Sequence, residues 1–130
     1  MDRLSMLIAY AAEAGQKPFR PGRHDCALFA AGWVKKVTGQ DHARGWRSTY
    51  RSLNRGQRLL EDAGYTDHLA LAAVHLPEIV PAFAQIGDLA VLDDNAFGIV
   101  AGEMLYCLKP QGLGLVPRSA MRRAFAVRTP

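Results

Sequence analysis

The order of hydrophobic patterns along this chain constrains its fold more than any other feature, because the pattern changes once, near residue 87. Before that point, apolar residues recur at intervals of three and four, which is typical of amphipathic helices. After it, short apolar runs are separated by turn residues, which is typical of strands. Helices followed by strands predict an α+β fold with an antiparallel β-sheet meander.

Turn-forming residues set the expected bounds of these elements. Gly15, Gly39 and Gly64 are suited to end helices, and we expect helices over residues 2–14, 25–37, 49–63 and 66–74. We expect strands over residues 89–92, 97–102, 104–108, 113–116 and 124–128. The sequence contains no internal repeat and no long linker, and 130 residues suffice for one hydrophobic core. The expectation is therefore a single domain over residues 1–130.

The composition and the hydrophobic pattern limit the class of protein to which this chain can belong. A hydrophobic content of 49% and a charged content of 22% are ordinary for a globular domain. No apolar stretch approaches the roughly 20 residues that span a bilayer, so we expect no membrane span. The N-terminal residues lack a basic segment followed by a long apolar core, so we expect no signal peptide.

Cys26 is the clearest candidate for a catalytic residue in this sequence. Asp25 precedes it and can cap the helix that the apolar residues Leu28, Ala31 and Val34 indicate. A thiol in the first turn of a helix lies near the positive end of the helix dipole and near free backbone N–H groups. Both effects favour the thiolate, which is the nucleophilic form of cysteine. The alternative is that Cys26 is a small buried apolar residue.

The remaining cysteine and histidines do not form a recognisable metal site. Cys26 and Cys107 are too few for a disulfide framework, and Cys107 fits a strand in the core. No zinc-binding spacing and no glycine-rich phosphate loop is present, so we expect no cofactor and no metal. His24 is close to Cys26 in sequence and is the candidate substitute base, although it can also be an exposed loop residue. The other histidines, expected to be structural or exposed, are His42, His68 and His75.

Arginine recurs in two segments that have no acidic residue within them, residues 44–58 and residues 118–128, and the first of these has helical spacing. The arginines of this first segment recur at intervals of three and four, so on a helix they would form one basic stripe. Trp46 and Tyr50 lie among them and are candidates for a partner surface. The alternatives are a solvated face or an anionic partner, and the scarcity of aromatic residues argues against nucleic acid. The arginines of this candidate partner surface are Arg44, Arg47, Arg51, Arg55 and Arg58.

Three short motifs occur in an order that resembles the NlpC-type cell-wall peptidases of the papain-like superfamily. They are His24-Asp25-Cys26-Ala27, Gly87-Asp88-Leu89 and Ala96-Phe97-Gly98-Ile99-Val100. The resemblance covers about residues 15–110. The spacing from Phe19 to Ala27 and the segment Thr38-Gly39-Gln40-Asp41 are similar to a phage and prophage branch whose members are encoded among tail genes.

The resemblance implies a papain-like NlpC-type fold in which Cys26 takes the nucleophile position and Asp25 precedes it as the helix cap. Ala96 then falls where the family has its catalytic histidine, and residues 106–108 contain no polar residue of the type that orients that histidine. Alanine can neither accept nor return a proton, and general acid–base assistance contributes roughly 10²–10⁴-fold to such reactions.

The resemblance therefore implies a phage or prophage-type tail component, associated with the distal tail or hub, with a degenerate peptidase fold. Its expected partners are tail hub or distal tail proteins, with peptidoglycan as a further candidate. The expected location is the virion tail, acting at the host envelope. The alternative is an active cysteine endopeptidase that cleaves peptidoglycan stem peptides, with Cys26 as nucleophile and His24 as base.

Overall fold

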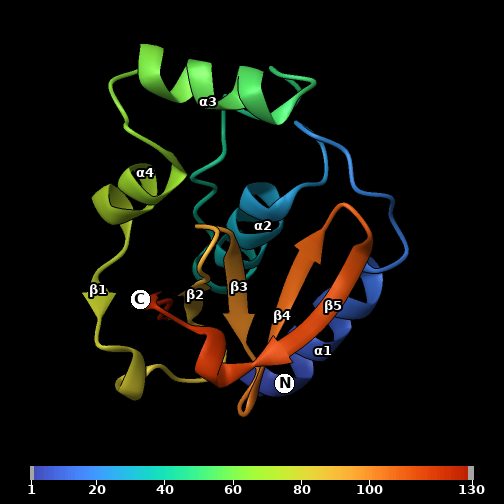
Figure 1. Cartoon of the computed structure of the whole chain (residues 1–130). Coiled ribbons are helices and arrows are strands. Elements are labelled where there is room, and N and C mark those ends of the chain that lie inside the picture. The colour runs from blue at the N-terminus through green and yellow to red at the C-terminus, as the bar shows by residue number, and fades with distance from the viewer. Residues whose placement is uncertain (1, 129–130) are drawn as a thin grey trace.

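A computed structural model describes residues 2–128 and shows an α+β architecture with four α-helices (Figure 1). Helix α1 spans Arg3–Ala14 and α2 spans Cys26–Thr38. Helix α3 spans Leu53–Asp62 and α4 spans His68–His75. No helix within residues 2–128 is both long and apolar enough to cross a membrane.

Six strands form one antiparallel sheet in the order β1-β6-β2-β3-β4-β5. The strands are β1 (Glu78–Ile79), β2 (Leu89–Val91), β3 (Phe97–Val100), β4 (Met104–Lys109), β5 (Gly112–Pro117) and β6 (Arg123–Phe125). Two short 3₁₀ helices, η1 (Pro81–Phe83) and η2 (Arg118–Ala120), flank the sheet. The meander from β2 to β5 confirms the expected antiparallel arrangement.

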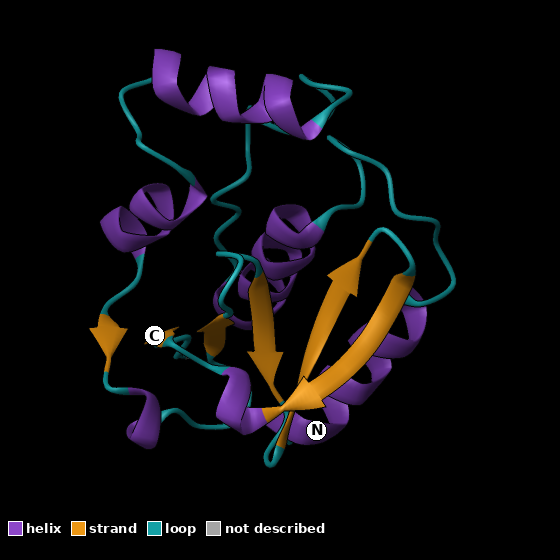
Figure 2. Cartoon of the chain, viewed as in Figure 1, coloured by secondary structure: helices purple, strands orange, loops and turns teal. Residues whose placement is uncertain are grey.

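The two faces of the sheet contribute to two apolar clusters, because side chains alternate across each strand. On one face, Phe97, Ile99 and Leu108 pack with Phe29 and Trp33 of α2. On the other, Ala90, Val100 and Leu105 pack with Ala84 and Met121, which adjoin η1 and η2. In Figure 2, α1 and α2 lie behind the strands, while α3 and α4 lie beyond one end of the sheet.

The Gly87-Asp88 turn connects α2, β2 and the C-terminal segment. The indole nitrogen of Trp33 donates to the Gly87 carbonyl at 2.7 Å. Asp88 is fully buried, and its carboxylate accepts from the backbone N–H of Gln85 at 2.7 Å and of Val127 at 2.9 Å. Arg128 also binds this carboxylate. This motif therefore fixes the position of β2 relative to α2.

Apart from small differences at the ends of elements, two expectations need correction and one strand was not expected. The third helix begins at Leu53 rather than Thr49, because Ser52 provides the N-cap by accepting from the Arg55 N–H at 3.1 Å. The last strand, β6, does not extend the meander beyond β5 but returns to lie between β1 and β2. Strand β1 was not expected, since it has only two residues, lies in the segment between Pro77 and Pro81, and is defined by its pairing with β6.

Candidate functional site

A cavity of about 570 Å³ lies beside the N-terminal half of α2. One face of α2, including Cys26, Ala30 and Val34, forms one wall. Segment 42–60 and α4 contribute further walls, and residues 94–97 and 108–111 of the sheet region complete it. Its lining is mostly apolar, and its volume is in the range of ligand-binding pockets.

Asp25 organises the α2 end of this cavity. Asp25 is 1% exposed. Its carboxylate accepts hydrogen bonds from residues around the start of α2. Oδ1 accepts from the Leu28 N–H at 2.9 Å, which confirms the expected N-cap. Oδ2 accepts from the Gly22 N–H at 2.9 Å and from the Tyr50 hydroxyl at 2.6 Å. The buried carboxylate is therefore satisfied by three donors from three parts of the chain.

Gly22 and Tyr50 are in direct backbone contact. Gly22 has a φ of +83°, and a Cβ atom at this position would lie 1.9 Å from the carbonyl oxygen of Tyr50. The Gly22 carbonyl also accepts from the Ser48 N–H at 2.8 Å. Because only glycine fits both the conformation and the space, Gly22 allows segment 46–50 to close over the start of α2.

Cys26 is the first residue of α2 and lines the cavity with its side chain partly buried. Burial raises the pKa of the Cys26 thiol to about 11, although the Phe97 backbone N–H acts in the opposite direction. The carboxylates of Asp25 and Asp94 raise this pKa further. The sequence-based expectation of a favoured thiolate is wrong, because burial and two carboxylates outweigh the helix terminus.

Ala96 lines the same cavity as Cys26, immediately before β3. The two histidines on the cavity wall are His68 and His42, and neither hydrogen-bonds the Cys26 sulfur. The Nε2 atom of His68 lies 2.5 Å from the Asn95 carbonyl oxygen, and its ring contacts Phe97 edge-on. The His68 imidazole is therefore hydrogen-bonded to the turn that carries Ala96.

His24, the candidate substitute base, does not line this cavity. Its Nε2 atom lies 2.9 Å from the Ala14 carbonyl oxygen, at the end of α1. His24 instead lines a second cavity on another side of α2. The structure thus brings Cys26 and Asp25 together but directs the His24 ring toward α1.

His42 and His75 form a stacked pair at the edge of the main cavity. Their ring centroids are 4.1 Å apart and their planes differ by 12°. Burial lowers the pKa of His42, and the neighbouring His75 lowers it further, while Asp41 opposes both effects. The pair joins the loop after α2 to the end of α4.

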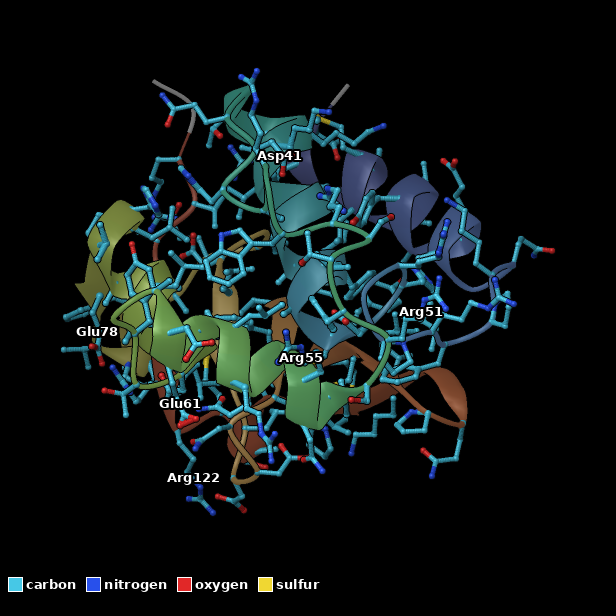
Figure 3. The ribbon with its side chains drawn as sticks, turned by 90° about the horizontal axis from the view of Figure 1, so that it is seen from above. Asp41, Arg51, Arg55, Glu61, Glu78 and Arg122 are labelled. Carbon is cyan, nitrogen blue, oxygen red and sulfur yellow. The ribbon has the colours of Figure 1, made fainter. Side chains whose placement is uncertain are left out.

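The residues of the candidate partner surface do not share one helical stripe. Arg44 and Arg47 lie in turns before α3, and Arg47 forms an ion pair with Asp41 at 3.2 Å. In Figure 3, Arg51 on the preceding loop and Arg55 on α3 lie apart from Asp41. The expected stripe is wrong because the backbone between residues 42 and 48 is folded into turns.

Trp46 and Tyr50 line the main cavity. Trp46 also contacts the edge of Tyr65, and burial raises the pKa of Tyr50, as does Asp25. The sequence-based prediction missed this location because it assigned both residues, with the arginines, to a surface that faces a partner. The sequence signal that was available is the glycine three residues before Asp25. It indicates that the Asp25 carboxylate is buried and needs a hydrogen-bond donor.

Cys107 is buried among apolar residues on the other sheet face, as expected, and both cysteines are free thiols. Among residues 2–128, no group of three or more histidine, cysteine, aspartate or glutamate side chains is arranged to hold a metal ion. The arrangement therefore provides a mostly apolar cavity with a protonated thiol on its wall.

No curated protein matches the sequence at a significant level. A family described as a domain of unknown function, DUF6950, matches residues 2–127. Because this match covers nearly the whole sequence, the chain belongs to the DUF6950 family.

Proposed function

We propose that this chain is a non-hydrolytic binding module related to the NlpC-type peptidases and that it serves as a component of a phage-type distal tail. The order of the Asp25-Cys26, Gly87-Asp88 and Ala96–Val100 motifs supports the relation. The α+β order, with a cysteine-led helix packed on an antiparallel sheet, supports it as well. The tail location rests on the resemblance to the phage branch.

The environment of the Cys26 sulfur carries the non-hydrolytic part of this proposal. With a pKa of about 11, the thiolate is roughly one part in ten thousand at neutral pH. A peptidase also needs a group that protonates the leaving amine. Of the two histidines on this cavity wall, His68 is bonded to Asn95 and His42 is stacked on His75. The thiol therefore lacks a base that activates it.

The shape of the cavity supports a binding role. A volume of about 570 Å³ and walls formed by residues such as Leu60, Leu71 and Phe97 suit apolar side chains. Few charges are present, and Asp25 is already satisfied by its own donors. The occupant that fits is an apolar chain segment of a neighbouring tail protein.

Retention by purified tail hub protein tests this proposal. We expect Cys26→Ala to be retained as well as the wild type, because the thiol is not needed for binding. Ala72→Trp, which fills the cavity from α4, is expected to abolish retention. Ala73→Trp is the matched control, since Ala73 is exposed on the same helix and does not line the cavity. Equal retention of both tryptophan variants would contradict the proposal.

One observation favours the second candidate, an active cysteine endopeptidase that cleaves peptidoglycan stem peptides. His68 and Cys26 line the same cavity. For activity, the His68 ring would have to leave the Asn95 carbonyl and reach the sulfur when substrate binds. Such an enzyme would lose its activity in both Cys26→Ala and His68→Gln, whereas His24→Gln would keep it, since His24 lines the other cavity.

A further inference from the structure

A second cavity, of about 420 Å³, lies between α1 and α2. Leu28 of α2 lines both cavities, whereas the other α2 residues of the second cavity, Phe29, Gly32, Lys35 and Lys36, do not line the main one. The residues that α1 and its following loop contribute are Tyr10, Glu13, Ala14 and Lys17. This cavity has no part in the function proposed above.

The charge of this lining is strongly one-sided. Five lining residues are cationic, and Glu13 is the one acidic residue among them. The main cavity, by contrast, is lined by the cation Lys109 and the acids Asp25 and Asp94. The five cations of the second cavity are Lys17, Arg23, Lys35, Lys36 and Arg47. A concave surface lined in this way concentrates positive potential.

Most of this charge is not neutralised by the protein. Arg47 is paired with Asp41, and Lys35 lies close enough to lower the pKa of that carboxyl group. Within residues 2–128, Lys17, Arg23 and Lys36 form no ion pair with a carboxylate. Each is exposed and available to a ligand.

Helix stability explains only part of this arrangement. Lys35 and Lys36 lie in the last turn of α2, where cations complement the helix dipole. Arg23 lies before the N-terminus of the same helix, where the dipole disfavours a cation. Cations at both ends of α2 therefore do not both stabilise the helix. Cations at both ends can, however, bind an anion that lies along the helix.

The lining of this cavity runs along α2. Its lining residues on α2 extend from Leu28 to Lys36, which corresponds to about 12 Å at the α-helical rise. Arg23 and His24 extend the lining beyond the first of these residues. A single small anion cannot contact cations at both ends, whereas a chain with repeated charges can.

The aromatic residues of the cavity are already occupied. The ring of Tyr10 stacks on Phe29 at 5.4 Å, and its hydroxyl donates to the Phe29 carbonyl at 2.6 Å. Gly32 permits this contact, because a Cβ there would lie 2.5 Å from the Tyr10 hydroxyl oxygen. The stacked rings of Tyr10 and Phe29 are therefore not free to stack on nucleic-acid bases, which single-stranded nucleic-acid sites require, and the His24 ring is hydrogen-bonded to the Ala14 carbonyl.

These observations point to one ligand class: the geometry assigns the cavity between α1 and α2 as a binding site for a linear polyanion that carries repeated phosphate groups and is recognised without bases. Lys and Arg side chains at both ends bind the phosphates, with Arg23 able to form two hydrogen bonds to one phosphate. The Tyr10 side of the cavity supplies a rigid wall.

Calorimetric titration with inorganic tripolyphosphate, at low ionic strength, tests this site. We expect saturable binding that is tighter than that of orthophosphate and weakens with added salt. Arg23→Gln combined with Lys36→Gln removes one cation from each end and is expected to weaken binding roughly tenfold. The matched control is Arg55→Gln combined with Arg58→Gln, which removes two exposed cations of α3 outside this cavity and is expected to change binding less than about twofold.

Three results would overturn the assignment. Tripolyphosphate that does not bind the wild type would exclude the site. Equal weakening in the two double variants would show attraction to the net charge of +4 rather than to the cavity. Tighter binding of single-stranded oligothymidylate, or of oligoglutamate, lost in Arg23→Gln/Lys36→Gln, would assign the cavity to nucleic acid or to an acidic protein segment instead. Circular dichroism of each variant confirms that it is folded.

Discussion

The hydroxyl of Tyr50 donates a 2.6 Å hydrogen bond to the buried carboxylate of Asp25, and this bond connects the loop before α3 to the start of α2. Tyr50→Phe removes one of the three donors of Asp25. We expect a loss of about 1–3 kcal/mol in the free energy of unfolding, because a buried charged acceptor loses a partner. Urea denaturation followed by circular dichroism measures this loss.

Tyr65→Phe is the matched control for this change. Tyr65 is also partly buried, and its hydroxyl forms no hydrogen bond with residues 2–128. We expect its free energy of unfolding to stay within about 0.5 kcal/mol of the wild type. Equal destabilisation by the two substitutions would show that the Tyr50–Asp25 bond contributes nothing specific.

A comparison of Gly22 with Gly45 separates the cost of a steric clash from the cost of a positive φ. Both have positive φ, but a Cβ on Gly22 would lie 1.9 Å from the Tyr50 carbonyl oxygen, whereas one on Gly45 would contact nothing within 4 Å. Gly45→Ala is expected to cost about 1–2 kcal/mol, from conformation alone. Gly22→Ala adds displacement of segment 46–50, and we expect it to cost at least about 2 kcal/mol more. Similar midpoints of thermal unfolding for the two variants would contradict this account.

Much of the fold could be predicted from local sequence signals. The Asp25 cap, the helix-ending Gly39 and the meander from β2 to β5 depend on residues close together in the chain. The position of β6 and the existence of β1 could not be predicted, because both depend on pairing between segments more than 30 residues apart.

The candidate site could be predicted only in part. The location of Cys26 at the start of α2 was confirmed, since a cap and a periodic run define it. Its thiol pKa could not be predicted, because the pKa depends on burial and on Asp94, which approaches from the sheet. His68 was expected to be structural or exposed, and its place on the cavity wall depends on how α4 packs.

The raised pKa of Cys26 predicts slow alkylation at neutral pH. Since the thiolate is the reactive form, the rate of reaction with iodoacetamide should rise with pH and reach half of its maximum near pH 11 in the native protein. The urea-unfolded protein should reach half of its maximum rate near pH 9, the ordinary range of a thiol. Mass spectrometry of a Cys107→Ser variant isolates the signal of Cys26. A native midpoint below pH 8 would contradict the buried, protonated thiol.

The stacked pair of His42 and His75 predicts a loss of stability in mild acid. The pKa of His42 is lowered in the folded protein, so its neutral form is favoured there. The unfolded chain binds the proton more tightly, and the contribution of His42 is therefore present above about pH 6.5 and lost as the pH falls below it.

We therefore expect the free energy of unfolding to decrease between about pH 7 and pH 5, and to decrease less in His42→Gln than in the wild type. Urea denaturation at both pH values measures the difference. His75→Gln should also reduce the pH dependence, because it removes the neighbouring positive charge that opposes protonation of His42. An unchanged pH dependence in both variants would exclude this pair as its source.

The proposed non-hydrolytic function requires that Cys26 lacks a base that makes it a nucleophile. Its most direct test is the release of soluble peptide fragments from purified peptidoglycan, with mass spectrometry of the products, by the wild type, Cys26→Ala and His68→Gln. We expect the wild type to release no more than Cys26→Ala. Release by the wild type that disappears in both Cys26→Ala and His68→Gln would contradict it and would establish a cysteine endopeptidase with His68 as its base.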